Sequence, residues 1–190
     1  METSPSLLDR LKSSPEDTDW EQLVSVYTPV IHGWLRRYSA SAQDVDDVVQ
    51  EVMSVVIRKL PLFERARLGS FRAWLRTITV NCLRESWRSK KFRPSTGSDF
   101  EQVLDFLGDP GSELSRIWDA EYDERVLQSL LGQVQSQVTD STWEMFRRVA
   151  VEGESSESVA ADLGVTVNAL YIARSRVMTK LRTLGRGLME

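Results

Sequence analysis

Helical periodicity dominates this 190-residue chain and limits what it can fold into. Apolar residues recur three and four positions apart through most of the sequence, whereas the alternation typical of β-strands is rare. Glycine and proline, with ten and six residues, are too sparse to divide the chain into many short elements. We therefore predict an all-α fold, with helices over about 19–38, 41–60 and 70–91 and further helices from about 113 onward. Pro29 predicts a kink or break near Thr28 in the first of these helices.

The segment 94–117 loses this periodicity. Prolines, glycines and serines surround one short apolar cluster there, formed by Val103, Leu104, Phe106 and Leu107. We interpret the segment as a flexible acidic linker with one or two helical turns. The sequence thus predicts two small helical domains, residues 1–93 and 118–190, joined by the linker 94–117.

Basic residues are concentrated in two islands, although the net charge is −4. Residues 58–93 contain eleven basic and two acidic side chains, and residues 163–190 contain five and one. Such clustering is typical of proteins that bind a polyanion. The alternative is two solvated helix faces.

Composition excludes several classes of protein. A run of eighteen apolar residues is absent from the sequence, so no membrane span is expected. The N-terminal sequence lacks the basic start and apolar core of a secretory signal, which favours the cytoplasm. The single cysteine, Cys82, cannot form an internal disulfide, and one cysteine with one histidine, His32, argues against a zinc site or a Cys/His nucleophile pair. We expect no cofactor, no small-molecule substrate and no enzymatic activity.

The clearest local motif lies near the C-terminus and is typical of a helix-turn-helix. Ala160 allows two helices to cross closely, Gly164 can end the first helix in a left-handed conformation, and Leu170 holds the second helix against the first. Thr166 is the expected N-cap of the second helix. That helix offers Asn168, Tyr171, Ser175 and Arg176 for base contacts and Arg174, Lys180 and Arg182 for phosphates. The alternative is an ordinary helical hairpin in a bundle.

The helix expected over 70–91 carries two faces. Its apolar face comprises Phe71, Trp74, Leu75, Ile78 and Cys82. A second stripe comprises Thr77, Asn81, Arg84 and Arg88, whose amide and guanidinium groups can contact bases and phosphates. Val80, Leu83 and Trp87 lie outside the apolar face and need either another helix or a nucleic acid. Before the helix, Arg65 and Arg67 stand near Gly69, and Ser70 is the expected N-cap; this loop could receive an unstacked base.

The preceding helix has Ser41 or Asp44 as its expected N-cap and begins with acidic residues, as the helix dipole favours. Asp47, Gln50 and Glu51 share one of its faces. This carboxylate–amide surface is either a solvated face or a docking surface for a basic partner helix. We reject a paired-carboxylate active site, because the sequence offers no metal partner or histidine beside it.

Three motifs together, in this order and spacing, resemble a bacterial RNA polymerase sigma factor of the extracytoplasmic-function (ECF) type. They are DVDDVVQEVMSVVIRKLPLF, FERARLGSFRAWLRTITVNCLRESWRSK and the helix-turn-helix with VTVNALYIARSRVMTKLR. The resemblance covers roughly residues 19–182. It implies an N-terminal region 2 domain, a linker that runs through the RNA-exit path of the polymerase, and a C-terminal region 4 domain.

The resemblance also implies roles for residues. Asp47, Gln50 and Glu51 occupy D-x-x-Q-E positions that dock on the β′ clamp helices of the polymerase core. The loop 64–70, with Arg65, Arg67 and Ser70, would capture a flipped base of the promoter −10 element. That element would be read from the stripe of Thr77, Asn81, Arg84 and Arg88, together with Trp87. The −35 element would be read by Thr166, Asn168, Tyr171, Arg174, Ser175, Arg176 and Lys180. The β flap, promoter DNA and an anti-sigma factor are the further partners that the family implies.

One departure from the family pattern concerns promoter choice. Many members have Lys-Ser-Arg after the aliphatic residue of the recognition helix, and this chain has Tyr171, Ile172 and Ala173. The change removes two charges from the base-reading face, so we expect a different promoter preference. A stand-alone helix-turn-helix regulator with an N-terminal sensing or dimerisation domain is the alternative function.

Overall fold

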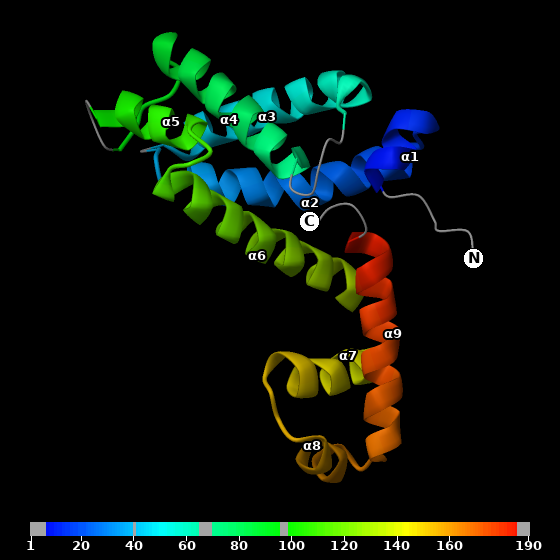
Figure 1. Ribbon diagram of the computed structural model, residues 1–190. Coiled ribbons are helices and arrows are strands. Elements are labelled where there is room, and N and C mark those ends of the chain that lie inside the picture. The colour runs from blue at the N-terminus through cyan, green and yellow to red at the C-terminus, as the bar shows by residue number, and fades with distance from the viewer. Residues whose placement is uncertain (1–6, 40, 65–69, 96–98, 186–190) are drawn as a thin grey trace. The chain divides into compact units, whose positions relative to one another are not determined.

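The computed structural model describes residues 7–39, 41–64, 70–95 and 99–185 (Figure 1). In these ranges the regular elements are all helices, apart from an isolated bridge between Ser39 and Pro94. The all-α prediction is therefore confirmed. The chain divides into two compact units, one that ends at Val126 and one that begins at Leu127. None of the described helices has both the length and the apolar character needed to cross a membrane.

In the described part of the first unit there are five complete helices and the start of a sixth. They are α1 (Leu7–Ser13), α2 (Asp17–Leu35), α3 (Ala42–Lys59), α4 (Ser70–Arg88), α5 (Phe100–Gly108) and the first part of α6 (Glu113–Gln135), with a 3₁₀ turn η1 (Leu60–Leu62) after α3. The helices predicted from about residues 19, 41 and 70 correspond to α2, α3 and α4. The cap predicted at Ser41 or Asp44 is Ser41, whose hydroxyl accepts a hydrogen bond from the Asp44 backbone N–H.

Helix α2 supplies the centre of the first core. Its residues at helical spacing are buried: Leu23, Val26, Tyr27, Val30, Ile31 and Trp34. Pro29 lies inside α2, which nevertheless continues to Leu35, so the chain does not break at Thr28. Burial of apolar residues on both sides of Pro29 offsets the lost backbone hydrogen bond.

Helix α1 was not expected from the sequence. It has seven residues, too few for periodicity to indicate a helix. It buries Leu7, Leu8 and Leu11, and it packs against α2 and η1. Its formation therefore depends on the surface that those elements provide.

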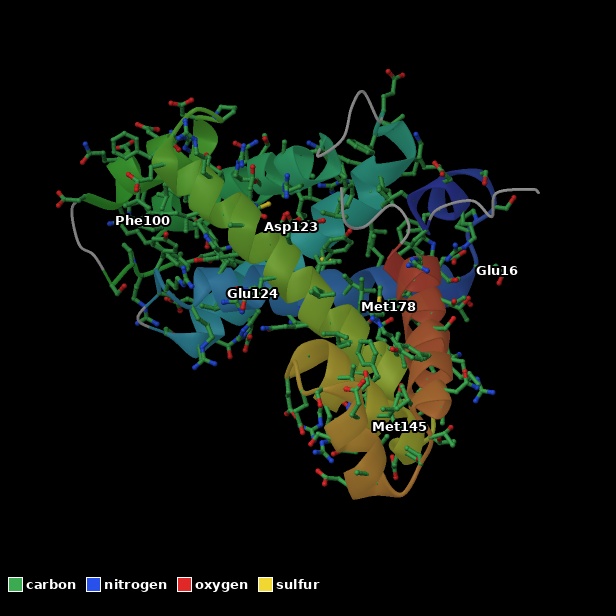
Figure 2. All side chains as sticks on the ribbon, turned by 60° about the horizontal axis from the view of Figure 1, so that its bottom comes forward. Glu16, Phe100, Asp123, Glu124, Met145 and Met178 are labelled. Carbon is green, nitrogen blue, oxygen red and sulfur yellow. The ribbon has the colours of Figure 1, made fainter. Side chains whose placement is uncertain are left out.

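The segment predicted as a linker, 94–117, contains α5 and the start of α6, and it lies within the first unit. Helix α5 packs on α4 and buries Phe100, Leu104 and Leu107. The Phe100 ring, labelled in Figure 2, stacks on Phe92 with centroids 5.5 Å apart. Leu104 and Leu107 of the short apolar cluster noted in the sequence thus lie on the buried face of an amphipathic helix, whereas Phe106 is exposed.

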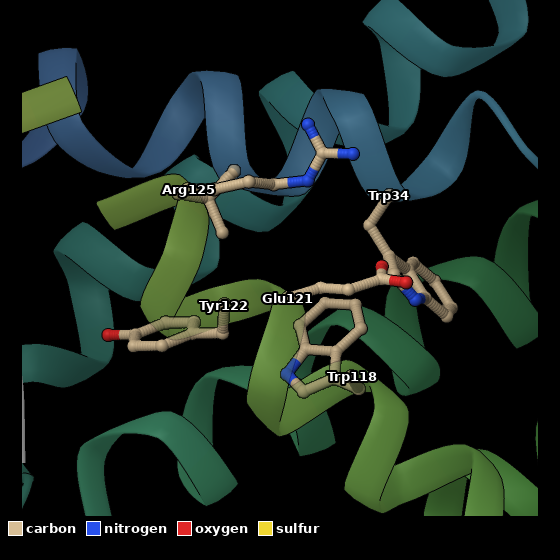
Figure 3. Close-up of a pocket in the computed structure, with 6 residues that line it drawn as sticks. Trp34, Trp118, Glu121, Tyr122 and Arg125 are labelled. Carbon is tan, nitrogen blue, oxygen red and sulfur yellow. The ribbon is translucent and has the colours of Figure 1, made fainter. Parts of the chain in front are cut away.

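The start of α6 packs against α2, as Figure 3 shows. The indole rings of Trp34 and Trp118 meet edge to face with centroids 4.3 Å apart. The Arg125 guanidinium lies so close to Gly33 that a side chain at that glycine would collide with it. The space between these side chains has no room for a water molecule, so it is a packing seam and not a ligand site.

The second unit contains the rest of α6, then α7 (Asp140–Phe146), a π-helical turn η3 (Arg147–Val151), α8 (Ser156–Leu163) and α9 (Val167–Gly185). One core cluster joins Val134, Phe146 and Val177. A second joins Val159, Ala160 and Leu170, between α8 and α9.

A buried carboxylate connects the start of α3 to the segment after α4. Asp44 accepts hydrogen bonds from the backbone N–H of Arg93 at 3.0 Å and from its Nε and Nη2 at 3.1 Å. These side-chain hydrogen bonds from Arg93 lower the pKa of Asp44 below its usual value, although burial opposes them.

We expect Asp44→Asn to lower the free energy of unfolding by about 1 kcal/mol at pH 7, a modest value because the Arg93 side chain is mostly exposed to solvent. The folded-state pKa lies below the unfolded value of about 3.9, so this stabilisation is present above that pH and is lost as the pH falls through the folded pKa. Urea denaturation at pH 7 and at pH 3 measures the difference. The exposed Asp47→Asn is the control; a difference that stays constant with pH would contradict a role for the Asp44 charge.

Candidate nucleic-acid interface

The exposed face of α4 carries part of the stripe predicted from the sequence. Thr77, Asn81 and Arg88 are exposed there, while Phe71, Leu75, Ile78 and Cys82 are buried on an adjoining face. Val80 and Leu83 are also buried, so neighbouring helices supply the cover that these residues were expected to need. The structure therefore leaves an amide, a hydroxyl and a guanidinium along one exposed helix face.

Two members of the predicted stripe are engaged by α5. The Arg84 Nη2 donates to the Asp105 carboxylate at 2.7 Å and to the Leu104 carbonyl oxygen at 3.3 Å. The Trp87 ring meets the Phe100 ring edge to face, with centroids 5.7 Å apart. Arg84 and Trp87 lie off the apolar face of α4 because, in this conformation, both contact helix α5.

Two further arginines of α4 have a structural role that the sequence did not reveal. The Arg76 side chain is 5% exposed, and its Nη1 lies 2.7 Å from the Asp119 carboxylate. The Arg72 Nη1 lies 2.6 Å from Asp123, which is labelled on α6 in Figure 2. The only signal in the sequence is that an acidic block follows the basic helix, and this does not identify the pairs.

The predicted residues of the loop before α4 cannot be assessed. Arg65 and Arg67 lie outside the residues that the structure describes. Ser70 is the first residue of α4, and its side chain is also outside the description. Their proposed contacts therefore stay predictions.

A groove of about 760 Å³ runs between α3 and α4. It brings Asp47 and Glu51 on α3 into one surface with Asn81 on α4. Its apolar lining comes from Val48, Val55, Ile78 and Cys82, and its further charged lining from Arg58, Lys59, Glu85 and Lys91. Gln50 is exposed on α3 but does not line the groove. The groove joins two sets of residues that the sequence presented as separate.

Cys82, at the base of this groove, is not a reactive thiol. Burial, followed by the nearby Glu51 charge, raises the pKa of the Cys82 thiol to about 11. The thiol therefore stays protonated near neutral pH, which argues against a nucleophilic role for Cys82.

The helix-turn-helix has the geometry that its sequence predicts. Gly164 ends α8 with φ 64° and ψ 31°, a left-handed conformation that favours glycine. The Val165 backbone N–H donates to the Ala160 carbonyl at 3.0 Å, and the Thr166 hydroxyl accepts from the Ala169 N–H at 3.2 Å. Ala160 and Leu170 are buried between the helices. Helix α9 is thus held by its inner face, and its outer face is open.

The predicted base- and phosphate-contacting residues lie on this outer face. Those that are exposed are Thr166, Asn168, Tyr171, Arg174, Ser175 and Arg176. Lys180 is half-buried, and its Nζ lies 3.5 Å from the Gln137 side-chain oxygen. Ser175, Arg176 and Lys180 also border a hollow of about 500 Å³ beside the start of α7. The helix contains no acidic residue.

Arginines outside the two basic islands are paired within the second unit. Arg148 contacts Glu154 and, at 2.8 Å, Asp162, and these hydrogen bonds raise its pKa above the usual value. Arg147 pairs with Glu144 and Glu152. The Arg148–Asp162 pair connects η3 to α8, whereas the Arg147 pairs connect η3 to Glu144 on α7 and to the residue that follows η3. Across the described ranges, no three His, Cys, Asp or Glu side chains are arranged to hold a metal ion.

Comparison with known proteins finds similarity to RNA polymerase sigma factors. The profile of sigma-70 region 2 matches residues 23–98. The ECF RNA polymerase sigma factor SigF of Caulobacter vibrioides (strain NA1000 / CB15N) is 29% identical over 152 residues, which cover 78% of this chain and 74% of SigF. The RNA polymerase sigma factor CnrH of Cupriavidus metallidurans (strain CH34) is 27% identical over 189 residues, which cover 96% and 95%.

A solved structure of CnrH, in complex with the cytosolic domain of CnrY, aligns with 94% of each chain. The TM-score is 0.38 and the sequence identity is 24%. The match over residues 23–98 spans α3 and α4 and therefore includes the groove and the exposed face described above.

We expect Phe100→Ala to lower the free energy of unfolding of the first unit by about 3–5 kcal/mol, because it empties a fully buried aromatic site. Phe106→Ala is the matched control on the same helix, since its ring is 50% exposed, and should change stability by no more than about 0.5 kcal/mol. Urea denaturation followed by circular dichroism measures both. Equal, small effects would mean that α5 is not docked on α4 in solution.

Proposed function

The chain belongs to the sigma-70 family as an ECF-type sigma factor, and we propose that its two units bind RNA polymerase core and two promoter elements through the surfaces described above. A sigma factor of this type directs transcription initiation and acts as a specificity subunit, not as an enzyme. The match of region 2 to residues 23–98 is the observation that carries this conclusion. Its site of action is then the cytoplasm, where the polymerase works.

The proposed surface for the polymerase core is the α3 side of the groove. Asp47, Gln50 and Glu51 are exposed within little more than one turn of one helix, and Asp47 and Glu51 border the groove. Their carboxylates and amide suit a basic partner helix, and we assign them to the β′ clamp helices. Charge complementarity of this kind supports specific docking more than raw affinity.

The proposed surface for the −10 element is the exposed face of α4, with Thr77, Asn81 and Arg88, and the loop with Arg65, Arg67 and Ser70. Arg84 and Trp87 belong to the same set, but α5 engages both in the free protein. Their contact with DNA requires α5 to leave α4. The Asp105 carboxylate and a DNA phosphate would then compete for the Arg84 guanidinium.

The proposed surface for the −35 element is the outer face of α9. Asn168, Tyr171, Ser175 and Arg176 would contact base edges, while Thr166, Arg174 and Lys180 would contact the backbone. The functional division into region 2 (1–93), linker (94–117) and region 4 (118–190) is part of the same proposal. So is docking of the second unit on the β flap.

A protein partner that restrains the factor is also proposed. The related CnrH has been solved in complex with the cytosolic domain of CnrY, and we infer an anti-sigma partner for this chain on that precedent. A stand-alone helix-turn-helix regulator is the less favoured function, because it has no use for the acidic face of α3 beside the basic α4.

In vitro transcription with core polymerase over a random promoter library tests the proposed function directly. The purified chain should cause RNA synthesis to start at defined sites that share two sequence elements. Transcription that depends on core polymerase alone, with no selected sites, would contradict the proposal.

We expect the double substitution Gln50→Ala and Glu51→Ala to weaken association with core polymerase at least about tenfold, because it removes the polar face of α3 without touching its buried side. Co-purification and a binding titration measure the loss. Glu101→Ala with Gln102→Ala, an exposed pair of the same composition on α5, is the control and should leave association unchanged. Unchanged co-purification of the first variant would remove the docking assignment.

We expect Asn81→Ala to reduce open-complex formation about tenfold, the effect of one lost base contact worth about 1–3 kcal/mol. Permanganate reactivity of thymines in the −10 element measures melting. Footprinting over the −35 element is the internal control and should not change. Melting equal to that of the unaltered protein would show that Asn81 reads no base.

A further inference from the structure

The outer face of α9 carries two large side chains with an apolar surface. Tyr171 is 56% exposed and Ile172 is 45% exposed. Neither belongs to the core cluster of Val159, Ala160 and Leu170, which the inner face of the helix completes. A single exposed apolar side chain is common on protein surfaces. The position of Tyr171 and Ile172 relative to the polar residues of α9 is therefore what indicates a function.

At about 100° per residue, Ile172 falls on the same stripe as Asn168, Tyr171 and Ser175. Arg174 and Arg176 lie on the two sides of this stripe, and all of these side chains are exposed. The stripe is opposite Leu170 and Val177, which are buried. The centre of the outer face is therefore uncharged and partly apolar, and its edges are basic.

This charge pattern fits duplex DNA better than it fits a protein surface. Helix α9 has no acidic residue. Arg174 and Arg176 flank the stripe, and Lys180 and Arg182 add two cations toward the C-terminal end of the helix. Arg174, Lys180 and Arg182 suit the phosphates that border a major groove, and the stripe, with Arg176 at its edge, then faces the base edges. Asn168 and Ser175 can form hydrogen bonds with those edges, but the Ile172 side chain cannot.

The major groove offers a partner for an aliphatic side chain in only one base. Each base edge there presents hydrogen-bond donors and acceptors, and thymine adds a C5-methyl group. From this juxtaposition we propose that Ile172 is a specificity-determining residue that packs against the C5-methyl of a thymine in the −35 element. The proposal rests on the proposed function and adds to it the chemical feature of the promoter that this stripe reads.

The test uses the holoenzyme and promoters selected from the random library. Each −35 thymine, on either strand, is replaced in turn by deoxyuridine, which removes only the methyl group. We expect one replacement to weaken binding by the unaltered holoenzyme about threefold to fivefold, the effect of burying a single methyl group. Binding by the Ile172→Ala holoenzyme should not distinguish thymine from deoxyuridine at that position.

Two controls separate this effect from a change in folding or in general affinity. Leu163→Ala removes an exposed aliphatic side chain from α8, outside the stripe, and should keep the discrimination. Thermal denaturation should be the same for the Ile172→Ala protein and the unaltered protein, because the side chain is largely exposed.

The possible failures can be told apart. If no promoter is selected, the proposed function fails together with this inference. If promoters are selected but their −35 elements lack thymine, or deoxyuridine binds as well as thymine throughout, only this inference is overturned. The inference is also overturned if the Ile172→Ala holoenzyme still distinguishes thymine from deoxyuridine. If that variant instead loses only its binding to a protein partner, the stripe belongs to a protein interface.

Discussion

Ion pairs between α4 and the acidic segment after it are the constraint on which the first unit depends. Arg76 is almost fully buried, and a guanidinium in that environment is costly unless a carboxylate lies beside it. Asp119 provides that carboxylate, and Asp123 does the same for Arg72. The basic helix α4 is thus paired with the acidic residues of α6. Contact between Trp118 and Trp34 also holds α6 against α2.

This arrangement separates the cations of the basic helix by role. Arg72 and Arg76 neutralise acidic residues within the fold, Arg84 is engaged by α5, and Arg88 is exposed. The formal charge of the segment 58–93 therefore overstates the positive charge that α4 leaves unpaired on its surface. The exposed amide of Asn81, which lines the groove between α3 and α4, distinguishes this surface better than its formal charge does.

The second unit depends on local geometry instead. A left-handed glycine, a hydroxyl cap and a small residue at the helix crossing are sufficient to set α8 and α9 at a fixed relation, since each acts within a few residues of the chain. The inner face of α9 then follows from Leu170, Ala173 and Val177, and its outer face is left for contact with a ligand.

The sequence by itself determined the all-α class, the approximate extents of α2, α3 and α4, the caps at Ser41 and Thr166 and the glycine that ends α8, because periodicity and capping are local. It did not reveal α1, which is too short to show a period. It also led us to a linker at 94–117, where the structure has α5 docked on α4 and the start of α6. Only the tertiary structure decided which arginines face carboxylates and that Asp47 and Glu51 share a groove with Asn81. Ion pairs and grooves bring together residues that are distant in the chain, and the spacing of those residues in the sequence does not indicate which of them meet.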